Sequence, residues 1–453
     1  MLSITIPPEV VRVLDAIRMA GGKPLLVGGC VRDALMGIQN SKDYDVEVFG
    51  LPLPKLREVL ERAGKVDAVG VSFGVFKIAG LPAEFSVPRR DNKIGAGHRG
   101  FEVSCDHKMT FAEAAKRRDL TINAIGYCPF TGKVFDEYWG RQDIDRLRLE
   151  CVDLDTFLDD PLRALRVVQF QSRFGFGLGP ALRDLLHKAS LAELPGERLY
   201  PEFLKMLRGP YVYSFAWPTL WNFGIADQFP ELAALRLCEQ DKEHHPEGNV
   251  AVHTGMAIGE AVTLTQDPVV LFAVLCHDFG KPATTKMEDG RWRAKGHEDA
   301  GEEPTRSFLN RLRASHDLTS AVVALVKRHL SPVLMPHSKA SPGAYRRLAR
   351  FLQGSGATML QLYQVSRADR FGRGTVEASR REFPEGVEFL ERTRNLSLEE
   401  KACEDAVMGR HLVERGLQPG PQFKPILDLC REYQYESGET DPAKIMDALG
   451  VKK

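Results

Sequence analysis

The first fifty residues alternate between helical and extended hydrophobic patterns. Apolar residues spaced three and four apart predict an amphipathic helix over residues 7–19, with its apolar positions at Val10, Val11, Leu14 and Ile17. An apolar strand over residues 25–27 then meets a Gly-Gly turn, and a short helix over residues 31–36 ends at Gly37. The next stretch, DYDVEVF at residues 43–49, alternates acidic and apolar positions and therefore predicts a strand with one acidic and one buried face.

Short elements continue to about residue 150. The pattern predicts a helix over residues 53–63 and strands over residues 66–69, 75–78 and 83–87, with glycine-rich turns between them. Residues 89–109 are polar, bear glycines and show little periodicity, so we expect a loop there. A loop of this length is uncommon in a compact domain and is often functional.

Beyond residue 150 the hydrophobic pattern is helical. A helix is expected over residues 159–176, with Pro161 in its first turn. The sequence thus predicts an α+β head followed by an all-α neck, an all-α domain and a helical tail. The expected boundaries are 1–150, 151–235, 236–375 and 376–453.

Composition limits the classes of protein that fit. The chain has 453 residues, 43% of them hydrophobic, which is enough for more than one core. Lys and Arg number 61 and so do Asp and Glu, so any RNA contact must come from local basic patches rather than net charge. The eight cysteines form no CxxC pair, and no signal peptide or membrane-spanning run is apparent. We expect a cytoplasmic protein with no membrane association, and no protein partner is evident.

Asp43 and Asp45 are the first candidate catalytic residues. On a strand they point the same way, and two carboxylates one strand repeat apart can hold Mg²⁺ and leave room for substrate phosphates. A solvated acidic face is the alternative for a DxD pattern alone. Glu84, on the last predicted strand, is either a third acidic residue near the metals or a charge on an edge strand.

Two stretches of the chain resemble motifs of a known family. They are the Gly-Gly turn followed by Arg32 and Asp33, and KRRDLTINAIGY at residues 116–127. The family they resemble is that of the DNA-polymerase-beta-like nucleotidyltransferases. Within it the chain is similar to the class II tRNA nucleotidyltransferases, which add CCA to tRNA 3′ ends, and to bacterial poly(A) polymerases. This chain departs from the family's RRDFTINA stretch only at Leu120, where the family has Phe. The resemblance implies that a nucleotide is bound by these two stretches, through Gly28, Gly29, Arg32, Arg118, Asp119 and Asn123. It also implies that residues 89–109 form a flexible loop linked to the switch from CTP to ATP.

The helix expected from residue 159 carries a pair with specific chemistry for a nucleobase. Asp160 and Arg163 lie three residues apart and would share a face, with Arg166 one step further along. A carboxylate accepts from an exocyclic amine and a guanidinium donates to a ring nitrogen, a pattern that fits cytosine and adenine but not uracil or guanine. The family has Glu-Asp-x-x-Arg here, whereas this chain has Asp159 in place of Glu. Capping of the helix start is the structural alternative for the two acids.

A second set of candidate ligands follows in the third region. It comprises His253, His277, Asp278, His297, His329 and Asp369, each in a stretch predicted to be helical. This order resembles the HD phosphohydrolase superfamily, in which helices bring His and Asp to a divalent metal. Imidazole and carboxylate together suit Mn²⁺, Ni²⁺, Co²⁺, Fe²⁺ or Zn²⁺. A scaffold that binds RNA without turnover is the alternative. Lys281 either contacts phosphate or caps its helix.

The sequence therefore predicts template-independent addition of CCA, from CTP and ATP, to the tRNA 3′ end, with Mg²⁺ at Asp43 and Asp45 and a transition metal in the HD domain. Three alternatives stay open: an enzyme that adds only the terminal A, a poly(A) polymerase, and a metal phosphohydrolase whose N-terminal domain only binds RNA. Arg346, Arg347 and Arg350 form either an RNA-backbone patch or a solvated face.

Overall fold

The computed structural model describes residues 2, 4–38, 43–67, 74–93 and 101–451. The chain forms two compact units. One comprises Met1–Leu194 with Pro218–Ile225, and the other comprises Pro195–Trp217 with Ala226–Lys453. The predicted neck, residues 151–235, is thus shared between the units, and the four-part division proposed from sequence stays a prediction.

A mixed seven-stranded sheet is the centre of the first unit, with strand order β3-β4-β5-β2-β1-β8-β9 among the described residues. Its strands are β1 (Lys23–Val27), β2 (Tyr44–Phe49), β3 (Val66–Asp67), β4 (Val75–Ile78), β5 (Ala83–Ser86), β8 (Gly126–Tyr127) and β9 (Val134–Phe135). Strand β2 runs antiparallel to β1 and parallel to β5. The predicted strands over residues 75–78 and 83–87 are confirmed, whereas residues 68 and 69 of the predicted third strand lie outside the described residues.

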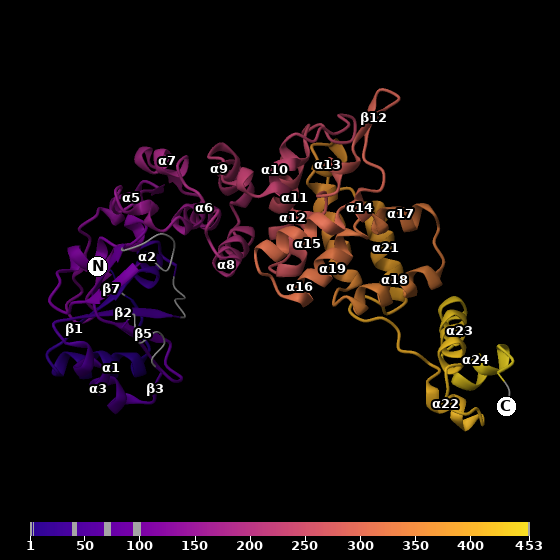
Figure 1. The fold of residues 1–453 in the computed structure, drawn as a ribbon, viewed down its shortest axis with the longest axis horizontal. Coiled ribbons are helices and arrows are strands. Elements are labelled where there is room, and N and C mark those ends of the chain that lie inside the picture. The colour runs from indigo at the N-terminus through magenta and orange to yellow at the C-terminus, as the bar shows by residue number, and fades with distance from the viewer. Residues whose placement is uncertain (1, 3, 39–42, 68–73, 94–100, 452–453) are drawn as a thin grey trace. The chain divides into compact units, whose positions relative to one another are not determined.

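The helices of the first unit include those predicted over residues 7–19, 31–36 and 53–63, of which the second begins two residues early, at Gly29. They are α1 (Pro8–Met19), α2 (Gly29–Leu35), α3 (Leu53–Ala63), α4 (Phe111–Ala115), η2 (Thr121–Asn123), α5 (Gly140–Asp145), η3 (Phe157–Asp159), α6 (Leu162–Phe174), α7 (Pro180–Leu186) and, continuing from the second unit, α9 (Trp217–Asn222). The short strands β10 (Arg148–Leu149) and β11 (Gly177–Leu178) pair in parallel. Helix α1 buries Val10, Leu14 and Ile17 as expected, and Val13 is buried in place of Val11. Helices α1 and α3 lie side by side against the sheet (Figure 1).

The loop expected over residues 89–109 is partly wrong. Its flanks pair as an antiparallel hairpin of β6 (Arg89–Lys93) and β7 (Phe101–Cys105), and residues 94–100 lie outside the described residues. Strand pairing rests on backbone hydrogen bonds, which polar stretches without hydrophobic alternation can also form, and this explains why the sequence pattern missed the hairpin. The expected link of this region to nucleotide switching stays a prediction.

Among its described residues the second unit contains helices and one hairpin, β12 (Lys286–Glu288) and β13 (Arg291–Arg293). Its helices before residue 300 are α8 (Gly196–Leu207), η4 (Val212–Ala216), η5 (Ala226–Gln228), α10 (Pro230–Arg236), α11 (Val250–Leu264), α12 (Pro268–Cys276), α13 (Lys281–Thr284) and α14 (His297–Ala300). Those after residue 300 are α15 (Glu302–Arg311), α16 (His316–Val326), α17 (Ser331–His337), α18 (Pro342–Gly354), α19 (Met359–Phe371), α20 (Val376–Ser379), α21 (Pro384–Asn395), α22 (Gly409–Glu414), α23 (Phe423–Ser437) and α24 (Pro442–Ala448).

Helix α12 lies at the centre of this unit, packed against α11, α16 and α19. Its residues from Val270 to Cys276 are fully buried, which accounts for its uniformly apolar sequence. One stretch, His316–His337, is long and apolar enough to cross a membrane by length and composition, but 56% of that window is buried inside the unit. Core helices meet the same criterion, so the stretch is weak evidence for a membrane span.

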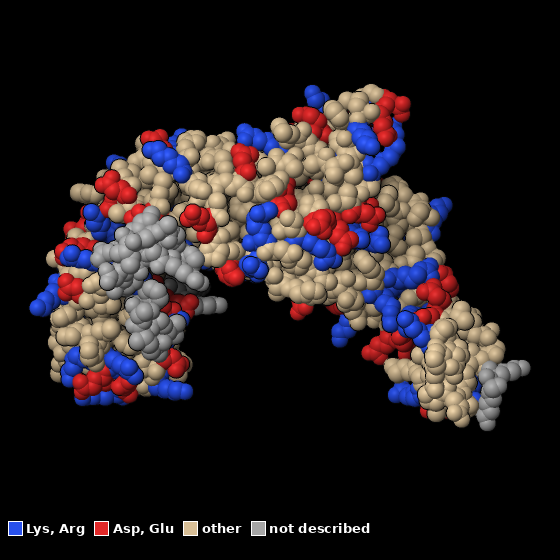
Figure 2. Space-filling view, in the orientation of Figure 1, with Lys and Arg blue, Asp and Glu red and all other residues tan. Residues whose placement is uncertain are grey.

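The arginines of α18 bind the tail of the chain. Arg347 forms ion pairs with Glu432 and Glu436 of α23, at 2.7 and 2.8 Å. Arg350 pairs with Asp405, and Arg346 donates to the carbonyl of Tyr435. Basic and acidic side chains lie next to each other in this region (Figure 2). Arg347 and Arg350 thus pair with acidic side chains and remain partly exposed, so the choice between an RNA-backbone patch and a solvated face stays open.

Candidate functional site

In the first unit, three carboxylates meet where β2 lies between β1 and β5. Asp45 is paired in register with Glu84 of β5, and Asp43 directly precedes β2. Strand β5 is flanked by β2 and β4, so the edge-strand alternative for Glu84 is wrong. Although Asp45 keeps solvent-exposed surface, desolvation by the surrounding protein raises the pKa of its carboxylate, and the charges of Glu84 and Asp43 raise it further, against the lowering effect of Arg118. Carboxylates that repel one another in this way suit a divalent cation bound through oxygen.

The Gly-Gly turn lies against these carboxylates. Gly28 has φ of 71°, a conformation that favours glycine, and it caps the start of α2. A Cβ atom at Gly28 would lie 3.2 Å from Nη1 of Arg118 and 3.4 Å from Oδ2 of Asp45. The turn, a metal-binding candidate and an arginine therefore adjoin, as a triphosphate and its metal ions require.

Arg118 is held beside this turn by Glu47. The Glu47 side chain is fully buried and lies 3.0 Å from Nη2 of Arg117 and 3.7 Å from Nη2 of Arg118. Burial lowers the pKa of Arg118, while Glu47 and Asp45 oppose that effect. Nε of Arg118 is buried and has no hydrogen-bond partner among the described residues. Glu47 was expected on the same acidic face as Asp43 and Asp45, but it anchors arginines and faces no solvent.

Asp119 and Asn123 join three parts of the first unit. Asp119 accepts from Nδ2 of Asn123 at 3.0 Å and from Nε of Arg166, on α6, at 2.7 Å. Asn123 in turn accepts from Nη1 of Arg32 at 2.5 Å, and Arg32 pairs with Asp33 at 2.7 Å. Burial alone would raise the pKa of Asp119, but Arg166 and Asn123 hold it below its usual value. The residues expected at triphosphate and ribose thus come together, with Arg32 buried in the network that fixes their positions.

Asp160 and Arg163 lie where α6 begins, but not as expected. The helix starts at Leu162, so Asp160 stands in the preceding turn and accepts from the backbone N–H of Leu162 at 3.2 Å. Arg163 donates to the carbonyl oxygens of Thr156 and Arg117, at 3.1 and 2.6 Å. The helix-face argument for this pair is therefore wrong, because Pro161 is the N-cap and not an internal residue. Its role at the base stays a prediction.

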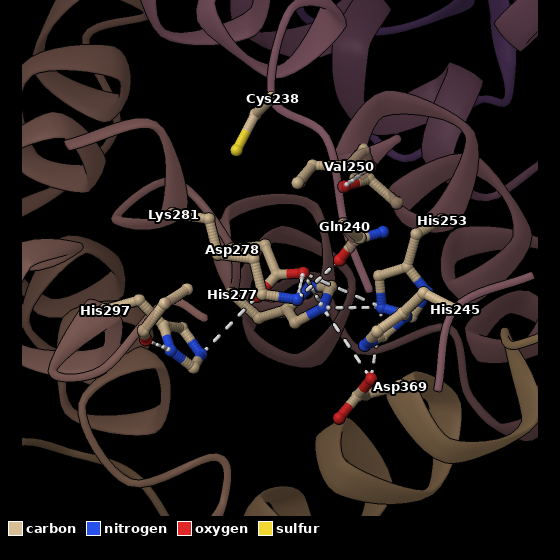
Figure 3. Close-up of polar contacts among 12 residues, drawn as sticks. Cys238, Gln240, His245, Val250, His253, His277, Asp278, Lys281, His297 and Asp369 are labelled. Atoms are coloured by element: carbon tan, nitrogen blue, oxygen red, sulfur yellow. Dashed lines mark hydrogen bonds and ion pairs between the residues drawn. The ribbon is translucent and has the colours of Figure 1, made fainter. Parts of the chain in front are cut away.

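The second unit brings all six predicted ligands into one buried cluster. Nε2 of His253 lies 3.2 Å from Nε2 of His277 and 3.1 Å from Oδ1 of Asp369. Asp278 joins them, with Oδ2 at 3.2 Å from Nε2 of His277 (Figure 3). These side chains come from α11, the end of α12 and α19.

His297 and His329 approach the other oxygen of Asp278. Nε2 of His297 lies 3.6 Å from Oδ1 of Asp278 and 3.2 Å from Nε2 of His329. Figure 3 shows His297 on the opposite side of Asp278 from Asp369. His329 was expected within a helix but lies between α16 and α17. The six residues thus form two groups that share Asp278.

Hydrogen bonds fix how these imidazoles face one another. His277, His297 and His329 each have Nδ1 2.7–2.8 Å from the carbonyl oxygen three residues earlier, so Nδ1 carries the proton. Nε2 is then an acceptor, and the facing Nε2 atoms of His297 and His329 repel each other unless a cation lies between them. Two nitrogens bound at about 2.1 Å to one ion lie about 3.0–3.4 Å apart, which matches their spacing.

The pKa shifts of Asp369 and His329 favour the charge states of metal ligands. Burial raises the pKa of Asp369, but Arg373 and His253 hold it well below its usual value. Burial lowers the pKa of His329 to about 3, with a contribution from His297. Metal ligands must be anionic carboxylates and neutral imidazoles, which is the state these shifts favour. Oδ2 of Asp278 faces Lys281 and His277, whereas Oδ1 has no hydrogen-bond partner among the described residues and is available to a cation.

A cavity of about 280 Å³ opens onto this cluster. Its lining includes Lys281, Trp292, Arg293 and Arg373 beside the metal-ligand candidates. Lys281 was weighed as a helix cap, but its Nζ lies 2.7 Å from Oδ2 of Asp278 and 2.7 Å from Oε1 of Gln240. A pocket with cations around a metal-ligand cluster suits an anionic substrate such as a phosphate ester.

Comparison with known proteins agrees with this architecture. Residues 25–150 match the family described as "Poly A polymerase head domain", and residues 181–235 match "Probable RNA and SrmB- binding site of polymerase A". The chain is 33% identical over 428 residues to the multifunctional CCA protein of Xanthomonas campestris pv. campestris (strain B100), covering 90% of this chain and 97% of that protein. It is 35% identical over 308 residues to the multifunctional CCA protein of Pasteurella multocida (strain Pm70), covering 65% of this chain and 70% of that protein.

The chain belongs to the family of multifunctional CCA proteins. Its fold is similar to that of the CCA-adding enzyme of Bacillus stearothermophilus in complex with CTP, with a TM-score of 0.69 and 21% identity over 98% of this chain and 99% of the other. It is also similar to the Thermotoga maritima CCA-adding enzyme complexed with tRNA, with a TM-score of 0.60 and 16% identity over 98% of this chain and 96% of the other. The resemblance to the tRNA nucleotidyltransferases and poly(A) polymerases is thus confirmed for the family and the fold, whereas the resemblance of the third region to the HD phosphohydrolases stays a prediction.

Sequence reasoning missed several residues of the second site. Glu247, Gln240 and Arg373 contact predicted ligands or Lys281 from loops and a helix end. Glu247 stands in the polar stretch HHPEG, a composition typical of surface loops. Nothing in that pattern distinguishes a buried carboxylate, and the adjacent His245 is the one hint of ligand chemistry.

Proposed function

We propose that this member of the family is a template-independent tRNA nucleotidyltransferase that adds CCA to tRNA 3′ ends from CTP and ATP. The observation that carries the proposal is the meeting of Asp45, Glu84, the Gly28 turn and Arg118 in the first unit. Relatives of this chain are named multifunctional CCA proteins, and similar solved structures are described as complexes with CTP, ATP and tRNA.

In this proposal the tRNA 3′-hydroxyl attacks the α-phosphate of the bound nucleotide in line, and pyrophosphate leaves. Asp43 and Asp45, with Glu84 beside them, would hold Mg²⁺, which supplies charge stabilisation for the attacking and leaving oxygens when bound. Arg118 and the backbone of Gly28 and Gly29 would position the triphosphate. The cytoplasm is the expected location of this reaction.

Choice of nucleotide would rest on Asp160 and Arg163. Asp160 would accept from the exocyclic amine of cytosine or adenine, and Arg163 would donate to the neighbouring ring nitrogen. Uracil and guanine would leave both groups mismatched, which is costly in a water-poor site. The network through Asp119, Asn123 and Arg166 would keep the start of α6 in place beside the nucleotide.

The proposal is tested by incubating purified protein with tRNA that lacks its three terminal nucleotides. Labelled CTP and ATP are supplied separately or together. We expect CTP incorporation on this tRNA and ATP incorporation after it. Absence of CTP incorporation would instead support an enzyme that adds only the terminal A. Long A tracts on generic RNA would support a poly(A) polymerase.

We propose a second activity, metal-dependent hydrolysis of phosphate esters, for the second unit. It is favoured by the two groups of ligands that share Asp278 and by the cation-lined cavity above them. Mn²⁺, Ni²⁺, Co²⁺, Fe²⁺ or Zn²⁺ suits this donor set, and a bound metal supplies an activated water. Lys281 and Arg373 would help to retain the phosphate. To test this activity, the full chain is treated with a chelator, each metal is added back in turn, and hydrolysis of bis-p-nitrophenyl phosphate is measured. Absence of hydrolysis with every metal would favour an RNA-binding scaffold.

A further inference from the structure

Glu247 lies behind the metal-ligand cluster and contacts parts of the chain that are distant in sequence. Its Oε1 is 3.0 Å from Nδ1 of His253 and 2.9 Å from Nδ1 of His245. Its Oε2 accepts from the backbone N–H of Gly374, at 2.9 Å, just beyond the helix that carries Asp369. The Glu247 side chain is only 3% exposed, so these contacts lie away from bulk water.

The carboxylate decides which nitrogen of His253 faces the metal-ligand candidates. A carboxylate only accepts, so Nδ1 of His253 must carry a proton, and the carbonyl of Gly372 at 3.2 Å imposes the same choice. Nε2 is then left to face His277 and Asp369.

We infer that Glu247 is a positioning residue of this centre: through His253 it sets the affinity for a divalent transition metal. A carboxylate that accepts from the distal nitrogen of a histidine fixes its orientation and increases its basicity as a ligand. Through Gly374 the same carboxylate also fixes the chain beside Asp369. The inference rests on the proposed metal-dependent activity of the second unit.

The test is titration of the full chain with Co²⁺, followed by calorimetry and by the visible absorption of the bound ion. Asp45→Ala is included in every protein so that the first unit contributes less binding. Glu247→Gln keeps the size and an acceptor oxygen but removes the charge. We expect its Kd for Co²⁺ to rise about 10- to 100-fold, with a shifted Co²⁺ spectrum. Glu247→Asp, which keeps the charge on a shorter side chain, should lie between.

Glu288→Gln is the control, because Glu288 lies on the hairpin with a 38% exposed side chain and pairs with Lys295 at 2.7 Å. Its Kd should stay within twofold of the parent protein. If Glu247→Gln binds Co²⁺ as tightly as the parent, the inference is wrong while the metal site stands. If the parent itself binds no Co²⁺, the proposed metal centre fails. Should Glu247→Gln not fold by circular dichroism, an unchanged Kd for Glu247→Asp overturns the inference.

Discussion

The two candidate sites differ in how their charged side chains are exposed to solvent and neutralised. In the first unit Asp45 stays exposed at the surface of a sheet, and arginines and a glycine turn surround it. In the second unit every predicted ligand is buried, and histidines offset the carboxylates. An open site suits a long tRNA end and a triphosphate, whereas a buried cluster keeps a metal in place and admits a small anionic group. We propose that the two sites act independently, so that a substitution can disable either one and leave the other intact.

Loss of the first carboxylate site should have the largest effect. Asp45→Ala removes a proposed Mg²⁺ ligand, and the bound metal would stabilise the transition state by several kcal/mol. Nucleotide addition should therefore fall by about 10³-fold or more. Labelled CTP incorporation measures it. Hydrolysis of bis-p-nitrophenyl phosphate by the same protein should be unchanged. Retention of nucleotide addition would support the alternative in which this unit only binds RNA.

The converse variant is His277→Ala in the second unit. It removes a buried imidazole that faces both His253 and Asp278, so metal-dependent hydrolysis should fall by about 10²-fold or more. CTP incorporation should stay within about twofold of the parent. A parallel fall in both activities, in a protein that is still folded, would argue against independent sites.

Gly28→Ala tests the close approach of the turn to Arg118 and Asp45. Alanine is strained at the positive φ of this position, by about 1–2 kcal/mol, and its Cβ would crowd two charged groups. We therefore expect a roughly tenfold or greater loss of nucleotide addition. Gly37→Ala is the control, since Gly37 also has a positive φ but its Cβ would meet no atom within 4 Å. Equal losses of activity in both variants would contradict the specific role of Gly28.

Asp160→Ala tests nucleotide choice. Removal of the proposed acceptor should reduce the preference for CTP and ATP over UTP and GTP by about 10-fold to 100-fold, as expected for about 1–3 kcal/mol. Competition between labelled nucleotides gives the ratio. A uniform loss of rate with unchanged preference would assign Asp160 to capping the start of α6, where it already contacts Leu162.

The smallest effect is expected for Arg347→Ala on α18. Its two ion pairs with α23 are about half exposed, so each should contribute less than about 1 kcal/mol. We expect a slight fall in Tm that disappears at high salt, and unchanged tRNA affinity. A clear loss of tRNA affinity with a shallower salt dependence would restore the RNA-backbone patch considered from the sequence.

Short motifs of the sequence determined much of this protein. Strand alternation placed Asp43 and Asp45 on one face, and the Gly-Gly sequence predicted a tight turn, because both follow local rules. The place of Arg118 beside them was implied by the resemblance to a known family. The His and Asp series likewise predicted a cluster, and the family followed from the same residues.

Only the tertiary structure decided how those groups are paired. Glu84 became a neighbour of Asp45 because β5 is inserted between β4 and β2, and Glu47 turned out to anchor arginines. Glu247 could not be distinguished from a surface acid, since its value as a partner depends on Gly374, which lies 127 residues away. Burial and long-range hydrogen bonds arise from packing, and residue type and spacing do not encode them locally.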